Sequence, residues 1–76
     1  MSSLAQCEAL AADPARYVFK LHLGHLKAAT SYDSQHLEIV RLGGYLSCLL
    51  ECDVIPSSTH GALLDELHAF VWGADA

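Results

Sequence analysis

The apolar residues of the C-terminal half recur at helical spacing. A helix is predicted from residue 57 or 58 to Trp72, and Gly73 suits its C-terminal stop. Its apolar stripe follows the 3.6-residue period and consists of Leu63, Leu64, Leu67, Phe70 and Val71. Residues 34–51 show the same period, with an apolar face made of Ile39, Leu42, Leu46, Leu49 and Leu50. The turn sequence DVIPSST lies between the two segments, so we expect them to form an antiparallel hairpin.

The N-terminal half contains helix start signals, but its apolar residues fit both helical and strand spacing. Ser2 or Ser3 can cap a short helix that ends near residue 12. Asp13 followed by Pro14 is a start signal for a second helix that runs to about residue 29. Within it, residues 17–24 (YVFKLHLG) also alternate as a strand would. The Asp-Pro start favours the helix, and the strand stays open as the alternative.

Together these patterns predict one all-α domain over residues 1–76, a small bundle of three or four helices with a C-terminal antiparallel hairpin. Hydrophobic residues make up 53% of the chain and charged residues 17%, against about 25% charged in an average domain. One small core has difficulty hiding so much apolar surface, so we expect a second chain to cover part of it, most simply in a homodimer. The expected core anchors are Leu42, Leu46, Leu49, Leu63, Leu67 and Phe70.

The charge and the cysteines limit the classes of partner and compartment. The chain is acidic, with a formal net charge of −5 when its histidines are neutral. This disfavours nucleic acid, because phosphate binding needs a basic surface. No apolar run approaches the roughly 18 residues that span a bilayer, so no membrane partner is expected. The three cysteines are an odd number, and the N-terminal residues do not resemble a signal peptide, so free thiols and a cytoplasmic location are expected.

Two pairs of side chains suggest metal binding as an alternative. Cys48 and Cys52 are spaced i,i+4, and His22 and His25 are spaced i,i+3, so each pair lies on one side of its helix. Together they offer the Cys2His2 ligand types that zinc prefers. The spacing lacks the tight C-x-x-C knuckle of structural zinc sites, and cysteine is also a small, readily buried apolar residue. We therefore expect no metal and no cofactor.

No catalytic constellation is present in the sequence. Ser57, Ser58 and Thr59 first suggest helix capping rather than a nucleophile, and Gly43-Gly44 has neither the preceding strand nor the following Lys-Ser/Thr of a phosphate-binding loop. An enzyme this small without a nucleophile–base pair or an acid pair is not expected, and we assign no catalytic residues.

A row of small residues on residues 34–51 suggests close packing with another helix. The row consists of Gly43, Gly44, Ser47, Cys48 and Cys52. Small side chains at this spacing form a shallow groove into which a second helix can pack, and in this chain it is a candidate dimer contact. The alternative is that the glycine pair breaks the segment into two shorter helices. Aromatic side chains are the usual anchors of protein interfaces, and the candidate partner-binding residues are Tyr17, Phe19, Tyr32, Tyr45 and Trp72.

The C-terminal half also resembles a known class of hairpin. The pattern is Gly44-Tyr45-Leu46-x-x-Leu49, then Val54-Ile55-Pro56, then Leu63-Leu64-x-Glu66-Leu67. It is similar to the helical hairpin of small accessory proteins of bacteriophages and bacterial mobile elements. The resemblance implies a protein that acts by binding in the bacterial or bacterial-host cytosol, such as an inhibitor of a host defence or regulatory protein, and it carries over no catalytic residues.

The favoured function is therefore a non-enzymatic binding module, an inhibitor or adaptor that acts on another protein through an apolar helical surface. Two alternatives stay open. One is a metal- or thiol-responsive regulator that uses Cys48 and Cys52 with His22 and His25. The other is a self-assembling structural subunit.

Overall fold

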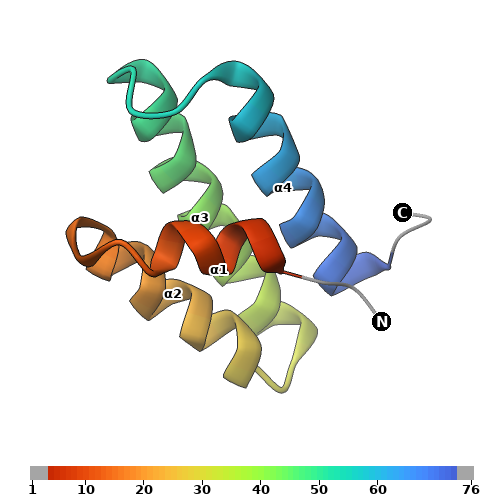
Figure 1. The fold of residues 1–76 in the computed structure, drawn as a ribbon. Helices are drawn as coiled ribbons and strands as arrows, with labels where there is room; N and C mark the ends of the chain where they lie inside the picture. Colours follow the sequence, from red (N-terminus) through yellow and green to blue (C-terminus); the bar gives the residue numbers. More distant parts are fainter. Residues whose placement is uncertain (1–3, 74–76) are drawn as a thin grey trace.

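The computed structural model of the chain describes residues 4–73, which fold into four α-helices and one 3-10 turn (Figure 1). In chain order these elements are α1 (Ala5–Ala11), η1 (Pro14–Arg16), α2 (Tyr17–Ala28), α3 (Tyr32–Glu51) and α4 (Ser57–Trp72). No strand occurs among residues 4–73, so the predicted all-α class is confirmed. Residues 17–24 are helical, and the strand alternative for them is wrong.

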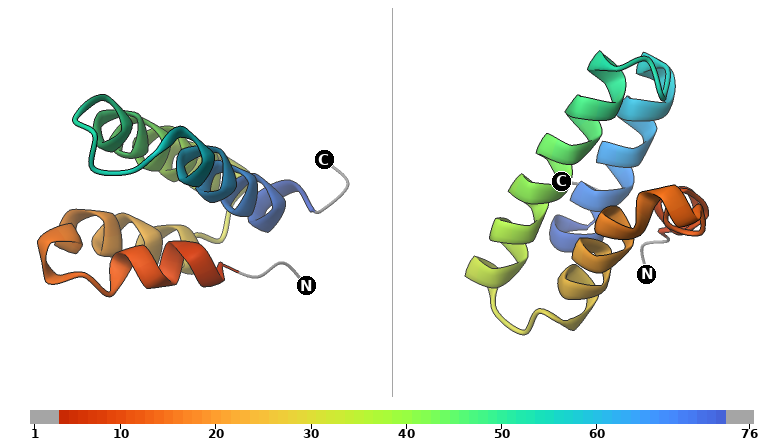
Figure 2. Two further views of the ribbon diagram at one scale, coloured as in Figure 1. Left: turned by 45° about the horizontal axis from the view of Figure 1, so that its top comes forward. Right: turned by 90° about the vertical axis from the view of Figure 1, so that its left-hand side faces the viewer.

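The helices form two layers. Figure 2 (left) shows α1 and α2 as one hairpin that lies on a second hairpin made of α3 and α4. Contacts between helices run in a ring, from α1 to α2, α3, α4 and back to α1. The antiparallel α3–α4 hairpin is the one that the sequence predicts, and the ring places α1 and α4 side by side although they are the first and last helices of the chain.

Local signals mark three of the helix ends. The Asp13 carboxylate accepts a hydrogen bond from the Ala15 N–H at 2.9 Å, with Pro14 following it in the first turn of η1. The Ser31 hydroxyl accepts from the Ser34 N–H at 3.2 Å, so α3 begins at Tyr32, earlier than predicted. Gly73, at φ 91°, ends α4 in a backbone conformation that only glycine adopts freely. The expected caps Ser2 and Ser3 lie outside the described residues.

The start of α1 is capped from a distant helix. Its N-cap residue, Leu4, makes no side-chain capping bond. Instead the carboxylate of Glu66, on α4, accepts hydrogen bonds from the backbone N–H groups of Gln6 and Cys7, each at 3.0 Å. A carboxylate at a helix N-terminus satisfies free N–H groups and complements the helix dipole. Glu66 therefore fastens α1 to α4.

The core lies between the two layers and is almost entirely apolar. Its buried residues are Leu4, Cys7, Ala11, Phe19, Leu23, Leu26, Ile39, Leu42, Leu46, Leu49, Ile55, Leu63 and Leu67. Five of the six predicted anchors are among them, and Phe70 packs against the cluster as a half-buried residue. Phe19 is completely buried and packs against Tyr45 at a tilt, with ring centroids 5.6 Å apart, so it belongs to the core rather than to a contact surface.

Helix α3 runs without interruption through Gly43 and Gly44, so the alternative of two shorter helices is wrong. None of the helices in the described range combines the length and apolarity that crossing a membrane requires.

Candidate functional site

Glu38 is the one buried charged side chain of residues 4–73, with 6% of its surface exposed. It lies on α3, next to the core residue Ile39, and faces α2 across the boundary between the two layers. A buried carboxylate is strongly unfavourable unless charged or hydrogen-bonding partners surround it. The residues around Glu38 therefore determine what this part of the molecule can do.

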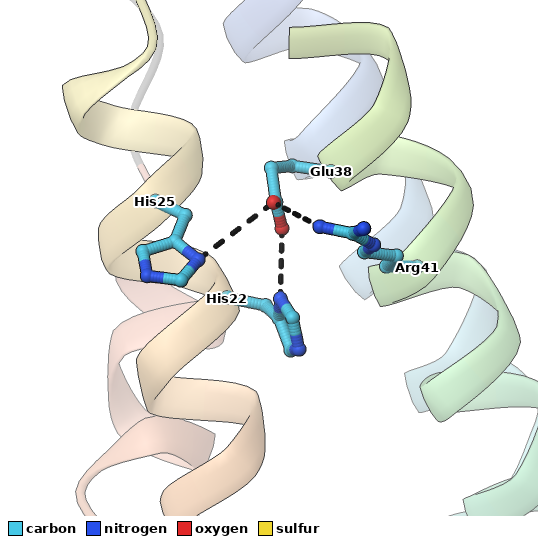
Figure 3. Close-up of polar contacts among 4 residues, drawn as sticks. All are labelled: His22, His25, Glu38 and Arg41. Carbon is cyan, nitrogen blue, oxygen red and sulfur yellow. Dashed lines mark hydrogen bonds and ion pairs between the residues drawn. The ribbon is translucent and has the colours of Figure 1, made fainter. Parts of the chain in front are cut away.

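Three side chains converge on the Glu38 carboxylate (Figure 3). His22 Nδ1 lies 2.9 Å from Oε2, and Arg41 Nη1 donates a hydrogen bond to Oε1 at 2.9 Å. His25 Nδ1 lies 3.7 Å from Oε1, which is too long for a hydrogen bond but close enough for an ion pair when the ring is protonated. The two histidines come from α2 and the arginine from α3, and we call these four residues the Glu38 cluster.

The partners keep the carboxylate charged. Burial by itself raises the pKa of Glu38, but the hydrogen bonds and charges of His22 and Arg41 outweigh burial and hold the pKa below its ordinary value. Glu38 is therefore ionised at neutral pH. His22 is about one-quarter exposed and His25 about one-half, so solvent reaches both imidazole rings, whereas the Glu38 side chain is only 8% exposed.

The sequence identified only part of this cluster. It singled out His22 and His25 as one half of an alternative metal set and paired them with Cys48 and Cys52. In the described structure both of those cysteines are exposed, and the group of potential ligands that includes the histidines is completed by Glu38. The sequence signal that was missed is Glu38, a charged residue directly beside Ile39 on the apolar face of the predicted helix.

A second feature joins the start of α3 to the end of α4. Trp72 Nε1 donates a hydrogen bond to the Tyr32 hydroxyl at 3.0 Å, although 38% of Trp72 and 57% of Tyr32 remain exposed. His36 stacks on the Tyr32 ring, and His68 meets the Trp72 ring edge-on at 5.4 Å. We call Tyr32 and Trp72 the aromatic pair. Two of the five predicted partner-binding residues thus form one exposed unit.

The other three predicted partner-binding residues have different environments. Tyr17 is 72% exposed on α2. Phe19 is buried, as described above. Tyr45 is half-buried, and its hydroxyl accepts a hydrogen bond from Arg16 Nη1 at 3.4 Å. Of these three, Tyr17 is therefore the one whose ring is open to another molecule.

The predicted small-residue row lies mostly on the outer surface of α3. Gly43 faces α4, where an added Cβ would lie 4.0 Å from Leu64 Cδ2. A Cβ added at Gly44 would meet no atom within 4 Å. The remaining members of the row, Ser47, Cys48 and Cys52, are exposed. Leu37 and Val40 extend the same side of the helix and are 48% and 59% exposed. We define the α3 outer stripe as Leu37, Val40, Gly44, Ser47 and Cys48.

No protein-family model matches the chain, and no curated protein or solved structure is significantly similar to it. The function is therefore inferred from the geometry of these surfaces.

Proposed function

We propose that this chain is a small, non-enzymatic binding module that inhibits or adapts another protein. The aromatic pair is the observation that carries the proposal. Tryptophan and tyrosine dominate the energetics of protein interfaces because they bury large areas and lose little conformational entropy. In this chain the Trp72–Tyr32 hydrogen bond already fixes both side chains before any partner arrives. Such preorganisation lowers the entropic cost of binding.

The class of partner follows from the resemblance of the C-terminal hairpin to phage and mobile-element accessory proteins. That resemblance supports a bacterial defence or regulatory protein as the target. All three cysteines are free, which fits the reducing cytosol in which such a target operates.

The α3 outer stripe supports a homodimer. Its five residues carry no charge, and all are exposed. At Gly44 the surface is open, so the backbone of a second helix can approach closely, as it does where small residues line helix contacts. We propose that a second copy of the chain packs along this stripe and leaves the aromatic pair available to the target.

The target-binding proposal is tested by comparing variants in an affinity capture. Tagged wild-type protein, Trp72→Ala and Tyr17→Ala are incubated with lysate of the native bacterial host, and the retained proteins are identified by mass spectrometry. Trp72→Ala removes half of the aromatic pair, whereas Tyr17→Ala removes a more exposed aromatic ring that lies outside it. We expect one host protein to be retained by wild type and Tyr17→Ala but lost with Trp72→Ala. Identical retention by all three proteins would refute the role of the aromatic pair.

The dimer proposal is tested with Gly44→Leu. The added side chain fills the open part of the α3 outer stripe without touching the chain's own core, so the fold should persist while self-association is lost. Sedimentation velocity should show a dimer for wild type and a monomer for Gly44→Leu. Val54→Leu, which enlarges an exposed side chain in the α3–α4 turn, is the matched control and should remain dimeric. An unchanged sedimentation coefficient for Gly44→Leu would remove the stripe from the interface.

A further inference from the structure

We propose that His22, His25 and Glu38 form a binding site for a single divalent transition-metal ion, with zinc as the ion that fits best. Two imidazole nitrogens and one carboxylate oxygen are a ligand set that zinc accepts, and three protein ligands leave one position for water. The proposal concerns a different surface from the aromatic pair and does not depend on the protein-binding function.

The distances between the ligand atoms suit a single ion. One atom each from His22, His25 and Glu38 can be chosen so that all three lie within 4.8 Å of one another. Ligands bonded to one tetrahedral zinc at about 2.1 Å are separated by about 3.4 Å. His22 Nδ1 and Glu38 Oε2 are 2.9 Å apart, so they have to separate by about 0.5 Å to admit the ion. His25 has to move inward by a small rotation of its side chain, which is about half exposed.

The backbone holds the two histidines in register. They are spaced i,i+3 on α2, and their rings lie edge to face with centroids 5.5 Å apart. Glu38 approaches from α3, so an ion bound by all three residues links the two layers of the fold. Metal binding is therefore expected to stabilise the folded chain as well as to occupy the site.

Metal binding requires an anionic carboxylate and an imidazole nitrogen without a proton. His22 Nδ1, which lies 2.9 Å from Glu38 Oε2, would exchange that contact for a bond to the ion.

Arg41 decides which ions can bind. Its Nη1 holds Oε1 at 2.9 Å, which leaves Oε2 for the metal and orients the carboxylate in the way that outer hydrogen bonds orient metal ligands. Its positive charge also opposes any cation. Only an ion that gains strongly from imidazole nitrogen can overcome that repulsion, which favours zinc and excludes the oxygen-seeking magnesium and calcium.

Isothermal titration calorimetry tests the site directly. Wild-type protein is titrated with zinc chloride and, separately, with magnesium chloride. We expect one zinc ion per chain with a micromolar dissociation constant and no heat with magnesium. His25→Ala is the decisive variant, because this ring is about half exposed and lies too far from Glu38 for a hydrogen bond, so the fold should tolerate its removal. Its zinc affinity should fall by more than about tenfold. His36→Ala removes an exposed histidine from the neighbouring part of α3 and should bind zinc as wild type does.

Cobalt substitution distinguishes this site from the cysteines. With nitrogen and oxygen ligands, the cobalt-loaded protein should show weak visible bands and no thiolate-to-cobalt charge-transfer band. The double variant Cys48→Ser/Cys52→Ser should give the same spectrum. The proposal is overturned if wild type gives no heat with zinc, if His25→Ala binds as tightly as wild type, if His36→Ala is weakened as much as His25→Ala, or if the cobalt spectrum contains a thiolate band. Circular dichroism of each variant verifies that the fold is retained.

Discussion

Two glutamates of the α3–α4 layer contact the α1–α2 layer, one through backbone groups and the other through side chains. Glu66 uses its carboxylate to accept two backbone N–H groups at the start of α1. Glu38 meets only side chains, those of His22, His25 and Arg41. Backbone N–H groups cannot leave Glu66 unless α1 moves, whereas the side chains around Glu38 can turn into solvent and be replaced. The first carboxylate is therefore a structural fastening, and the second is suited to exchange partners.

The largest expected effect comes from Glu66→Ala. The substitution leaves the N–H groups of Gln6 and Cys7 without their acceptor, at the end of a helix that has no local cap. Loss of an N-terminal cap costs about 0.5–2 kcal/mol, and we expect the upper part of that range because the same carboxylate also joins α1 to α4. Urea denaturation measures the change. Asp65→Ala, at the exposed neighbouring position of α4, is the control and should lie within about 0.5 kcal/mol of wild type.

Cys7 reports on the same fastening. Burial, followed by the neighbouring carboxylates of Glu66 and Glu8, raises the pKa of its thiol to about 12. At mildly alkaline pH the native thiol is therefore protonated as well as inaccessible, and thiolate is the reactive form. We expect a thiol reagent to label two cysteines of the wild-type chain rapidly, the exposed Cys48 and Cys52, and Cys7 slowly.

In Glu66→Ala, labelling of Cys7 should accelerate by about tenfold or more, because a loss of about 1.4 kcal/mol raises the population of the locally opened state by that factor. Peptide mapping assigns the labelled residue, and Asp65→Ala is again the control. If Cys7 were labelled at the same slow rate in both variants, α1 would be held by its apolar contacts rather than by the Glu66 carboxylate.

The sequence predicts elements better than it predicts these two contacts. Periodicity and capping residues are local, so they locate α3, α4 and the Asp13-Pro14 start within a few residues. The partners of Glu66 lie about 60 positions away, and only the packing of α1 on α4 brings them together. His22 and His25 were found from their i,i+3 spacing, but the α2–α3 register that adds Glu38 is a tertiary property.

Phe19 shows the same limit on a single residue. The segment around it is apolar over so wide an arc that periodicity does not say which side faces the core. The packing of α2 on α3 decides that side, and it buries Phe19 against Tyr45 while leaving Tyr17 exposed. The Tyr32–Trp72 contact joins residues 40 positions apart, so local sequence patterns could not predict it either.

A smaller effect is expected from Glu38→Met, which tests the other side of the comparison. Methionine fills a similar volume and removes the buried charge, while Arg41 and His25 are exposed enough to be hydrated on their own. Breaking a buried ion pair is costly when it leaves a buried charge without a partner, and this substitution removes the buried member and leaves the exposed ones. We expect the free energy of unfolding at neutral pH to change by less than about 1 kcal/mol. A loss as large as that of Glu66→Ala would show that Glu38 is also a structural fastening.

The pH dependence of that same pair of proteins is the smallest and sharpest test. Burial raises the pKa of Glu38, but His22 and Arg41 lower it further, so the folded pKa lies below the ordinary value of 4.5. As pH falls below that value, the unfolded chain takes up a proton at Glu38 before the folded chain does, and wild type loses stability that Glu38→Met never had. The free energy of unfolding of wild type, relative to that of Glu38→Met, should therefore be highest above pH 4.5 and should decrease as pH falls further.

Urea denaturation of both proteins between about pH 6 and about pH 3 measures this difference, and the titration of groups remote from the Glu38 cluster cancels in the comparison. A difference that does not change with pH, or that grows in favour of wild type in acid, would mean that the carboxylate is not held charged by its histidine and arginine partners.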